Sequence, residues 1–148
     1  MDQNIKNAIA SGVEREPFAR ALGIELKELE TGFSAVEMTY QPALMDNLFG
    51  RAHGGAIFAL IDEAFEVACQ SEGTLSVGMN VSVTYVASPR PGTRLRAEAR
   101  EISRSAHTLN YSILVRELDG RTVATCQALG FRTSRPLPFL EHQGAFGA

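Results

Sequence analysis

The chain has 148 residues, of which 45% are apolar and 21% are charged, a composition typical of one globular domain. Its 14 basic and 17 acidic side chains give a formal charge of −3, which does not fit a protein that binds nucleic acid by neutralising phosphates. No apolar run approaches the roughly 20 residues that span a bilayer, and the polar N-terminus lacks the apolar core of a signal peptide. We therefore expect one cytoplasmic domain over residues 1–148, without a membrane segment or a nucleic-acid partner.

Two residue types that carry metal and redox chemistry are sparse. Cys69 and Cys126 lack a CxxC partner and are too few for a disulfide framework, so we expect reduced, buried thiols. The three histidines, His53, His107 and His142, show no HxH or HExxH spacing. The sequence therefore predicts neither a metal site nor a bound cofactor.

The first third of the chain predicts two short helices and then two strands. Ile5, Ala8 and Ile9 lie on one side of the first helix. The second helix should run from Pro17 to Gly23, because proline is favoured at a helix start and glycine just past its end. These N-terminal helices occupy residues 1–23. Strands are expected over residues 24–29 and 33–40, and residues 41–53 are expected to be irregular.

Residues 54–70 predict one largely enclosed helix. Apolar side chains cover more than half of its circumference, and only Asp62, Glu63 and Glu66 interrupt them on a narrow arc. A helix on the surface would be polar over far more of its circumference. We interpret Glu63 and Glu66 as solvated or structural residues.

The period of the pattern changes from 3.6 to 2 after this helix. In residues 75–86 the odd positions are apolar and the even positions are polar or small, as in a half-buried strand. Further strands are expected over residues 93–102, 108–118 and 122–133, and residues 135–148 are expected to form a flexible tail. Runs of strands around a single helix argue against an alternating βαβ fold. They predict an α+β hotdog fold, in which an antiparallel sheet wraps around one central helix.

Two glycines, Gly54 and Gly55, open the central helix. Backbone N–H groups at a helix start lack intrahelical partners, and the absence of a Cβ lets a ligand oxygen approach them closely. These residues therefore form a candidate oxyanion hole for a carbonyl under attack. Tight packing or a strained entry turn would explain the two glycines equally well.

Asp62 is the candidate general base or nucleophile. It lies in the middle of an apolar helix, where partial desolvation would raise the pKa of its carboxyl. The alternative is that Asp62 belongs to a solvated acidic stripe. Asp62 follows Gly54 by 8 residues, or about 12 Å along one helix, whereas oxyanion donors must lie within about 3 Å of the reacting oxygen. A catalytic site that uses both residues must therefore be shared across a dimer.

Four sequence features together resemble one enzyme family. They are Asn47, the triplet His53-Gly54-Gly55, Asp62, and the segment Ser76-Val-Gly-Met-Asn80. This combination resembles the PaaI-like (phenylacetate-pathway type) hotdog acyl-CoA thioesterases, and the resemblance extends over residues 17–133, strand order included.

The resemblance implies an acyl-CoA thioesterase that requires no cofactor and assembles as homodimers paired into homotetramers, with the active sites at subunit interfaces. It implies that Asp62 activates water or attacks the thioester carbonyl, and that Gly54 supplies the oxyanion N–H. It further implies that Asn47 helps to hold the site and that Ser76 orients the water. For His53 it favours a loop-fixing role over that of a catalytic base.

One departure from the family concerns the phosphates of coenzyme A. Many members carry a glycine and a basic residue in the turn where this chain has Ala106-His107. Arg90 and Arg104 are therefore candidate phosphate partners, since the guanidinium fork matches phosphate, although plain solvated arginines fit as well. Two other functions stay open at this point. They are a hotdog hydratase or dehydratase acting on acyl thioesters and a non-catalytic acyl-CoA binding protein.

Overall fold

The computed structural model describes residues 1–140, which form helices at the N-terminus and in the centre and strands elsewhere. The helices are α1 (Gln3–Arg15), α2 (Pro17–Leu22), α3 (Pro42–Met45) and α4 (Gly54–Cys69). The strands are β1 (Glu25–Glu30), β2 (Phe33–Thr39), β3 (Thr74–Tyr85), β4 (Arg94–Arg104), β5 (Thr108–Glu117) and β6 (Thr122–Pro136).

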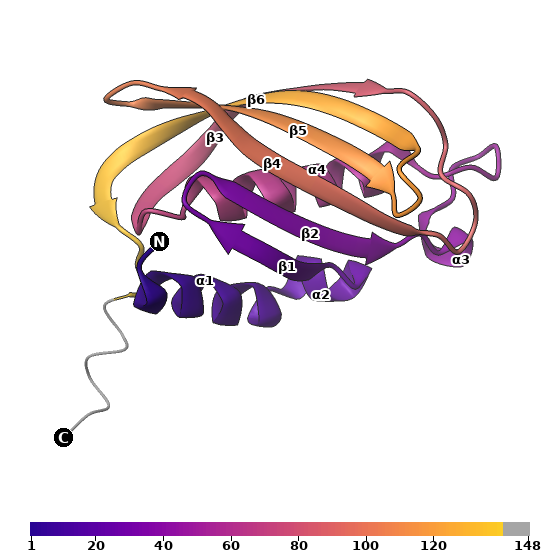
Figure 1. The fold of residues 1–148 in the computed structure, drawn as a ribbon. Coiled ribbons are helices and arrows are strands. Elements are labelled where there is room, and N and C mark those ends of the chain that lie inside the picture. Colours follow the sequence, from indigo (N-terminus) through magenta and orange to yellow (C-terminus); the bar gives the residue numbers. More distant parts are fainter. Residues whose placement is uncertain (141–148) are drawn as a thin grey trace.

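The strands form one antiparallel sheet in the order β1-β2-β4-β5-β6-β3, so that β1 and β3 are its edges. The sheet curves over α4, and α1 and α2 lie beside the end of the sheet that β1 forms (Figure 1). This arrangement confirms the predicted α+β hotdog architecture. Its consequence for function is that one edge strand, β3, runs beside the central helix with no neighbouring strand on its outer side.

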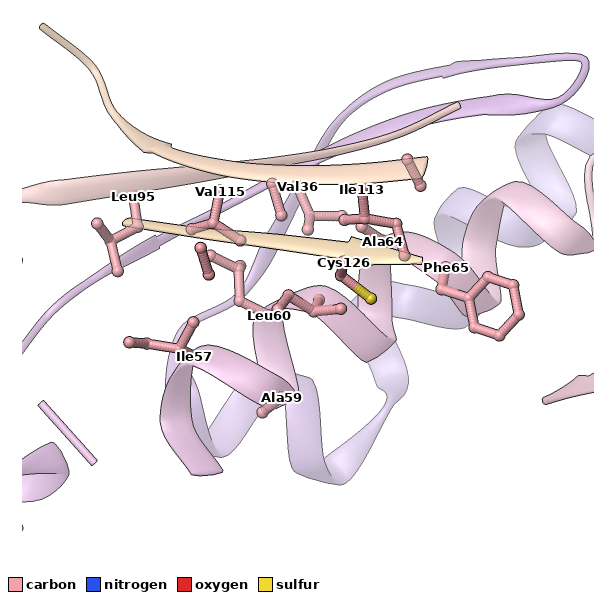
Figure 2. Close-up of a cluster of buried hydrophobic side chains, with 14 of the residues drawn as sticks. Val36, Ile57, Ala59, Leu60, Ala64, Phe65, Leu95, Ile113, Val115 and Cys126 are labelled. Carbon is pink, nitrogen blue, oxygen red and sulfur yellow. The ribbon is translucent and has the colours of Figure 1, made fainter. Parts of the chain in front are cut away.

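The main core lies between α4 and the concave face of the sheet. Leu60, Ile61 and Ala64 of α4 are fully buried there. Figure 2 shows side chains of α4 beneath the strands that carry Leu95 and Val115. The apolar face predicted for this helix is thus the face that packs against the sheet, and it fixes the direction in which the polar residues of α4 point.

A second, smaller core encloses α4 from another side. Ile9 and Val13 of α1 pack there with Val67 of α4 and with Leu137, which is 1% exposed. Because two cores flank the helix, apolar residues cover most of its circumference. The predicted flexible tail does not begin at residue 135, since β6 extends to Pro136 and the backbone N–H of Leu137 donates to the Gly73 carbonyl at 3.0 Å. Residues 141–148 lie outside the described part of the chain.

Other boundaries agree closely with the sequence patterns. Gly23 ends α2 in the left-handed conformation at φ 67°, as expected of a glycine after a helix. The segment over residues 41–53 was expected to be irregular but contains the single turn of α3. Cys69 and Cys126 are free and buried, and burial raises the pKa of the Cys69 thiol to about 12. Among the described helices, none has the length and apolar character needed to cross a membrane.

Candidate active site

Asp62 faces a cleft between α4 and β3. The cleft has a volume of about 600 Å³, and Ser76 at the start of β3 lines it together with Asp62. Desolvation beside the helix raises the pKa of the Asp62 carboxyl above its ordinary value, although the side chain is exposed to the cleft in the single chain. The structure therefore brings together two predicted site residues from different elements.

The backbone of Ser76 is held firmly, but its hydroxyl is not. The Gln70 side chain accepts from the Ser76 N–H at 2.9 Å and donates to the Ser76 carbonyl at 2.8 Å. Within residues 1–140 the hydroxyl donates to the Thr74 carbonyl alone, at 3.3 Å, and the residue is 4% exposed. The oxygen therefore keeps lone pairs that can accept a hydrogen bond from a water molecule in the cleft.

A β-bulge in β3 turns Ser76 toward the helix. Between Gly78 and Asn80 the strand advances two residues while β6 advances one, so that Met79 is the extra residue. A Cβ on Gly78 would lie 3.4 Å from the Phe65 ring, which places Gly78 on the side of α4. The prediction that the odd-numbered residues of this strand form its buried face is therefore correct only after the bulge. Before it, Val77 points outward and is 48% exposed.

Gly54 offers a free backbone donor at the start of α4. Its N–H makes no hydrogen bond to any atom within residues 1–140, as expected for the first amide of a helix. On the other side, the Tyr85 hydroxyl donates to the Gly54 carbonyl at 3.0 Å. A Cβ at this position would lie 3.1 Å from the Tyr85 ring, so glycine allows a closer packing than a larger residue would without a shift of the ring. The free N–H and the positive end of the helix suit an oxyanion.

The backbone N–H of Gly55, unlike that of Gly54, is not free. Its N–H donates to Nδ1 of His53 at 2.9 Å, and His53 is the N-cap of α4. The prediction that Gly55 supplies a second oxyanion donor is therefore not met in this conformation. The same bond occupies the Nδ1 lone pair of His53, which favours the loop-fixing role over the catalytic one.

Asn47 shapes the loop before α4. Its Oδ1 accepts from the N–H of Phe49 at 2.8 Å and from the N–H of Arg51 at 3.3 Å, while the backbone pairs Asp46 with Ala52. The Nδ2 group donates to no atom of the described chain, so this amide is free to bind a ligand. The loop carries Phe49 with 83% of its surface exposed.

The predicted residues form two groups within one chain. Asp62 and Ser76 lie at the cleft, whereas Asn47, His53 and Gly54 lie at the N-terminal end of α4. Two turns of helix, about 12 Å, separate Gly54 from Asp62. A single chain therefore does not bring the oxyanion donor and the carboxylate onto one substrate atom.

Both candidate phosphate ligands are already paired with carboxylates. Nε of Arg90 donates to the buried Glu117 at 2.8 Å, and its guanidinium also contacts Asp119. Arg104 donates to Glu101 at two positions and to Glu72 at 2.7 Å. A phosphate would have to share either arginine with these partners, and the phosphate role of both stays a prediction.

Two residues of interest were not identified from the sequence. Tyr85 looked like one more member of an alternating strand, and no local signal indicated its bond to Gly54. Glu63 was expected to be solvated or structural, yet it is only 4% exposed, so the solvated interpretation is wrong. The local signal for Glu63 was mixed, because Ala59, Leu60 and Val67 at its helical neighbour positions are apolar whereas Glu66 is acidic.

Sequence comparison places this architecture in a known family. A family model described as "Thioesterase superfamily" matches residues 49–124, which include α4 and β3. The chain belongs to the thioesterase superfamily. Within it, the chain is 33% identical to acyl-coenzyme A thioesterase PaaI of Escherichia coli over 111 residues, which is 75% of this chain and 79% of that protein.

Solved thioesterase structures agree with this assignment. The structure of Escherichia coli PaaI, from the phenylacetic acid degradation operon, superposes with a TM-score of 0.84 at 28% identity, over 90% of this chain and 96% of that one. A mutant of PaaI from Thermus thermophilus gives 0.75 at 32% identity, over 80% and 100% of the two chains. A Streptococcus mutans protein bound to acetyl CoA shares the fold, with 0.72 at 24% identity over 77% and 91%. The chain is thus a PaaI-like hotdog thioester hydrolase, which confirms the resemblance noted in the sequence.

Proposed function

We propose that this thioesterase hydrolyses acyl-CoA thioesters to a carboxylic acid and free coenzyme A. The observation that carries the proposal is the free Gly54 N–H at the start of a helix whose Asp62 faces a cleft. The name of the Escherichia coli relative and the acetyl CoA in the Streptococcus mutans structure support a coenzyme A ester as the substrate.

In the proposed reaction Asp62 acts on the thioester carbonyl through water or directly. As a base, it takes a proton from water, and the water oxygen bonds to the carbonyl carbon. The π electrons of the carbonyl move to its oxygen, and the resulting oxyanion accepts a hydrogen bond from the Gly54 N–H. The C–S bond then breaks, and the sulfur leaves with the electron pair and takes up the proton from Asp62. As a nucleophile, the Asp62 carboxylate would instead bond to the carbonyl carbon and expel the coenzyme A sulfur, which leaves with the electron pair of the C–S bond and takes up a proton from water. The resulting mixed anhydride is then hydrolysed by water to the carboxylic acid and free Asp62.

Two further residues position the reactants in this proposal. Ser76 holds the attacking water through its hydroxyl, which has one long hydrogen bond to the protein. Asn47 contacts the acyl group through its free Nδ2 while its Oδ1 maintains the loop. The hydratase alternative is less well supported, because the Nδ1 of His53 accepts a backbone N–H rather than pairing with an acid.

The site is proposed to be complete only in a homodimer. β3 is an edge strand of 12 residues with unpaired backbone groups on its outer side, and Val77 and Met79 on it are about half exposed. A second copy paired with this edge in antiparallel orientation would bring its Gly54 toward the Asp62 of the first. The pairing of such dimers into tetramers stays a prediction from the family resemblance.

The first test is thiol release from a panel of acetyl-, hexanoyl-, palmitoyl- and phenylacetyl-CoA. Asp62→Asn should lower kcat by about 10²- to 10⁴-fold, because the proton acceptor is lost while the side-chain volume is kept. Glu14→Gln, an equal change of charge on the exposed face of α1, is the control and should keep the activity. Near-normal turnover of Asp62→Asn would refute the assignment. A wild type that binds coenzyme A without releasing thiol would be the acyl-CoA binding protein instead.

The second test asks whether one site uses both subunits. Asp62→Asn and Gly54→Ala chains are co-expressed in equal amounts with different affinity tags. Half of the dimers are then mixed, and each mixed dimer holds one intact site, so about one quarter of the wild-type activity should return. If each chain carried its own complete site, the mixture would be no more active than the two separate variants.

A further inference from the structure

A second cavity lies on another side of α4, between this helix, α1 and the segment over residues 137–139. Its volume is about 370 Å³, and its walls are mostly apolar, with Ile9, Val13 and Leu137 among them. Three carboxyl groups, none of which the proposed reaction uses, also line this cavity: Glu16, Glu63 and Glu66. Three carboxylates at one place in an apolar cavity need another group that balances their negative charge.

The three carboxyl groups converge from two parts of the chain. Glu16 lies at the junction of α1 and α2, and Glu63 and Glu66 lie on one side of α4. One carboxylate oxygen from each residue lies within 4.8 Å of those from the other two. Glu63 is 4% exposed, and its Oε1 atom is buried without a hydrogen-bond partner in the described chain. A buried polar atom without a partner is costly, so Glu63 needs a proton, a water molecule or an ion to satisfy it.

Protein cations do not balance these acids. Within residues 1–140 no lysine, arginine or histidine forms an ion pair with any of the three carboxylates. Arg15 lines the cavity, but its guanidinium donates to the Ser11 hydroxyl. Burial, together with the charges of Glu16, Glu66 and Asp62, raises the pKa of Glu63 to about 8. Either a proton or a bound cation must therefore neutralise the cluster.

We propose that Glu16, Glu63 and Glu66 bind one hard divalent cation of the Mg²⁺, Mn²⁺ or Ca²⁺ class. For Ca²⁺, whose oxygen ligands lie at about 2.3–2.6 Å, two ligand oxygens on one ion lie at most about 5 Å apart. The observed spacing of the carboxylate oxygens satisfies this limit. The cavity beside the cluster leaves room for the water molecules that complete the coordination. The ion would tie the α1–α2 junction to the central helix.

The test measures thermal unfolding of the full chain at pH 8.5 after EDTA treatment and dialysis. MnCl₂, CaCl₂ and MgCl₂ are added separately at millimolar concentration, with KCl at equal ionic strength as the blank. At least one divalent cation should raise Tm by about 3–8 °C, since a ligand that binds only the folded state stabilises it. Titration of Mn²⁺ followed by its EPR signal should give one bound ion per chain.

Glu63→Gln keeps the side-chain shape and should abolish both the Tm rise and the Mn²⁺ binding. Glu14→Gln, the charge-matched control on α1, should retain both, because Glu14 lies outside the cluster. If Glu63→Gln does not fold, Glu16→Gln at the half-buried edge of the cluster should give the same loss. The proposal fails if no divalent cation changes Tm beyond the KCl blank, which would mean that a proton shared between Glu16 and Glu63 neutralises the acids. The proposal also fails if the divalent cation still raises Tm in the Glu63→Gln and Glu16→Gln variants.

Discussion

The hydroxyl of Tyr85 donates to the carbonyl of Gly54 at 3.0 Å, so the last residue of β3 holds the first residue of α4. This bond holds the peptide between Gly54 and Gly55, which directly follows the Gly54 N–H that is the proposed oxyanion donor. Tyr85 touches neither the cleft nor Asp62, and we therefore regard it as a positioning residue.

Tyr85→Phe tests this positioning role. Removing the hydroxyl should lower kcat for thiol release by about 5-fold, because one hydrogen bond of about 1 kcal/mol to the Gly54 carbonyl is lost at the start of the helix. KM should change little, since the ring that packs on Gly54 is kept. Steady-state kinetics with the best acyl-CoA of the panel separate the two constants. An unchanged kcat would show that the peptide needs no such support.

Gly54→Ala tests the close packing at the same place. The added methyl group would lie 3.1 Å from the Tyr85 ring, which must give by a few tenths of an ångström, and the methyl would hinder the close approach of a ligand oxygen to the Gly54 N–H. We expect kcat to fall by about 10²-fold, as for loss of an oxyanion donor. Gly12→Ala in α1 is the matched control, because nothing lies within 4 Å of its added methyl. It should keep the activity and gain about 0.5–1 kcal/mol of stability from helix propensity.

The dependence of stability on pH should reflect Glu117. Hydrogen bonds from the Arg90 guanidinium and from the Arg90 backbone N–H hold the pKa of the Glu117 carboxyl below its usual value of 4.5. A carboxyl with a depressed folded-state pKa stabilises the protein above its unfolded-state pKa and loses this contribution as the pH falls through the folded-state value. The Tm of the wild type should therefore drop more steeply between about pH 5 and 3 than that of Glu117→Gln. Parallel Tm curves over this range would contradict the role of this pair.

The edge strand should control assembly. Met79 is 59% exposed on β3, and a charge there would be buried if a second copy paired with this edge. Met79→Lys should shift the mass measured by light scattering to that of one chain and abolish thiol release. Ser103→Lys, a change to lysine on β4 away from this edge, should leave the mass unaltered. A Met79→Lys dimer with full activity would exclude β3 as the interface.

The sequence predicted the central helix almost exactly where it lies, because its period of apolar residues is long and unbroken. The expected range, residues 54–70, differs from the observed Gly54–Cys69 by one residue. The burial of Glu63 was missed, since it depends on α1 packing across the helix, a contact between distant segments. The loop-fixing role of His53 was anticipated through the family resemblance, whereas its bond to Gly55 follows only from the loop conformation.

The phase of β3 could not be predicted from alternation. A perfect odd–even pattern over residues 75–86 predicts one continuous buried face, and that prediction holds for Val81 and Val83. It fails for Ser76 and Val77, because the bulge at Met79 exchanges the two faces. Gly78 beside position 79 is a local signal, since an isolated glycine in a strand often marks a bulge, but the bulge itself is defined by the pairing with β6. The alternation pattern did not indicate that Ser76 lines the cleft, and its expected role in orienting water, which came from the family resemblance, stays a prediction.

The extra residue Met79 decides which face of β3 the side chains before and after it take, and the lining of the cleft depends on this. With Met79 present, Ser76 before it and Val81 after it both face the helix. Deletion of that single codon would make the two halves of the strand incompatible, so that either the hydroxyl leaves the cleft or a valine leaves the core. A conservative replacement such as Met79→Leu preserves the count and should be harmless. At this position the number of residues matters more than their identity, and single-codon length changes in β3 should be far rarer among functional variants than substitutions.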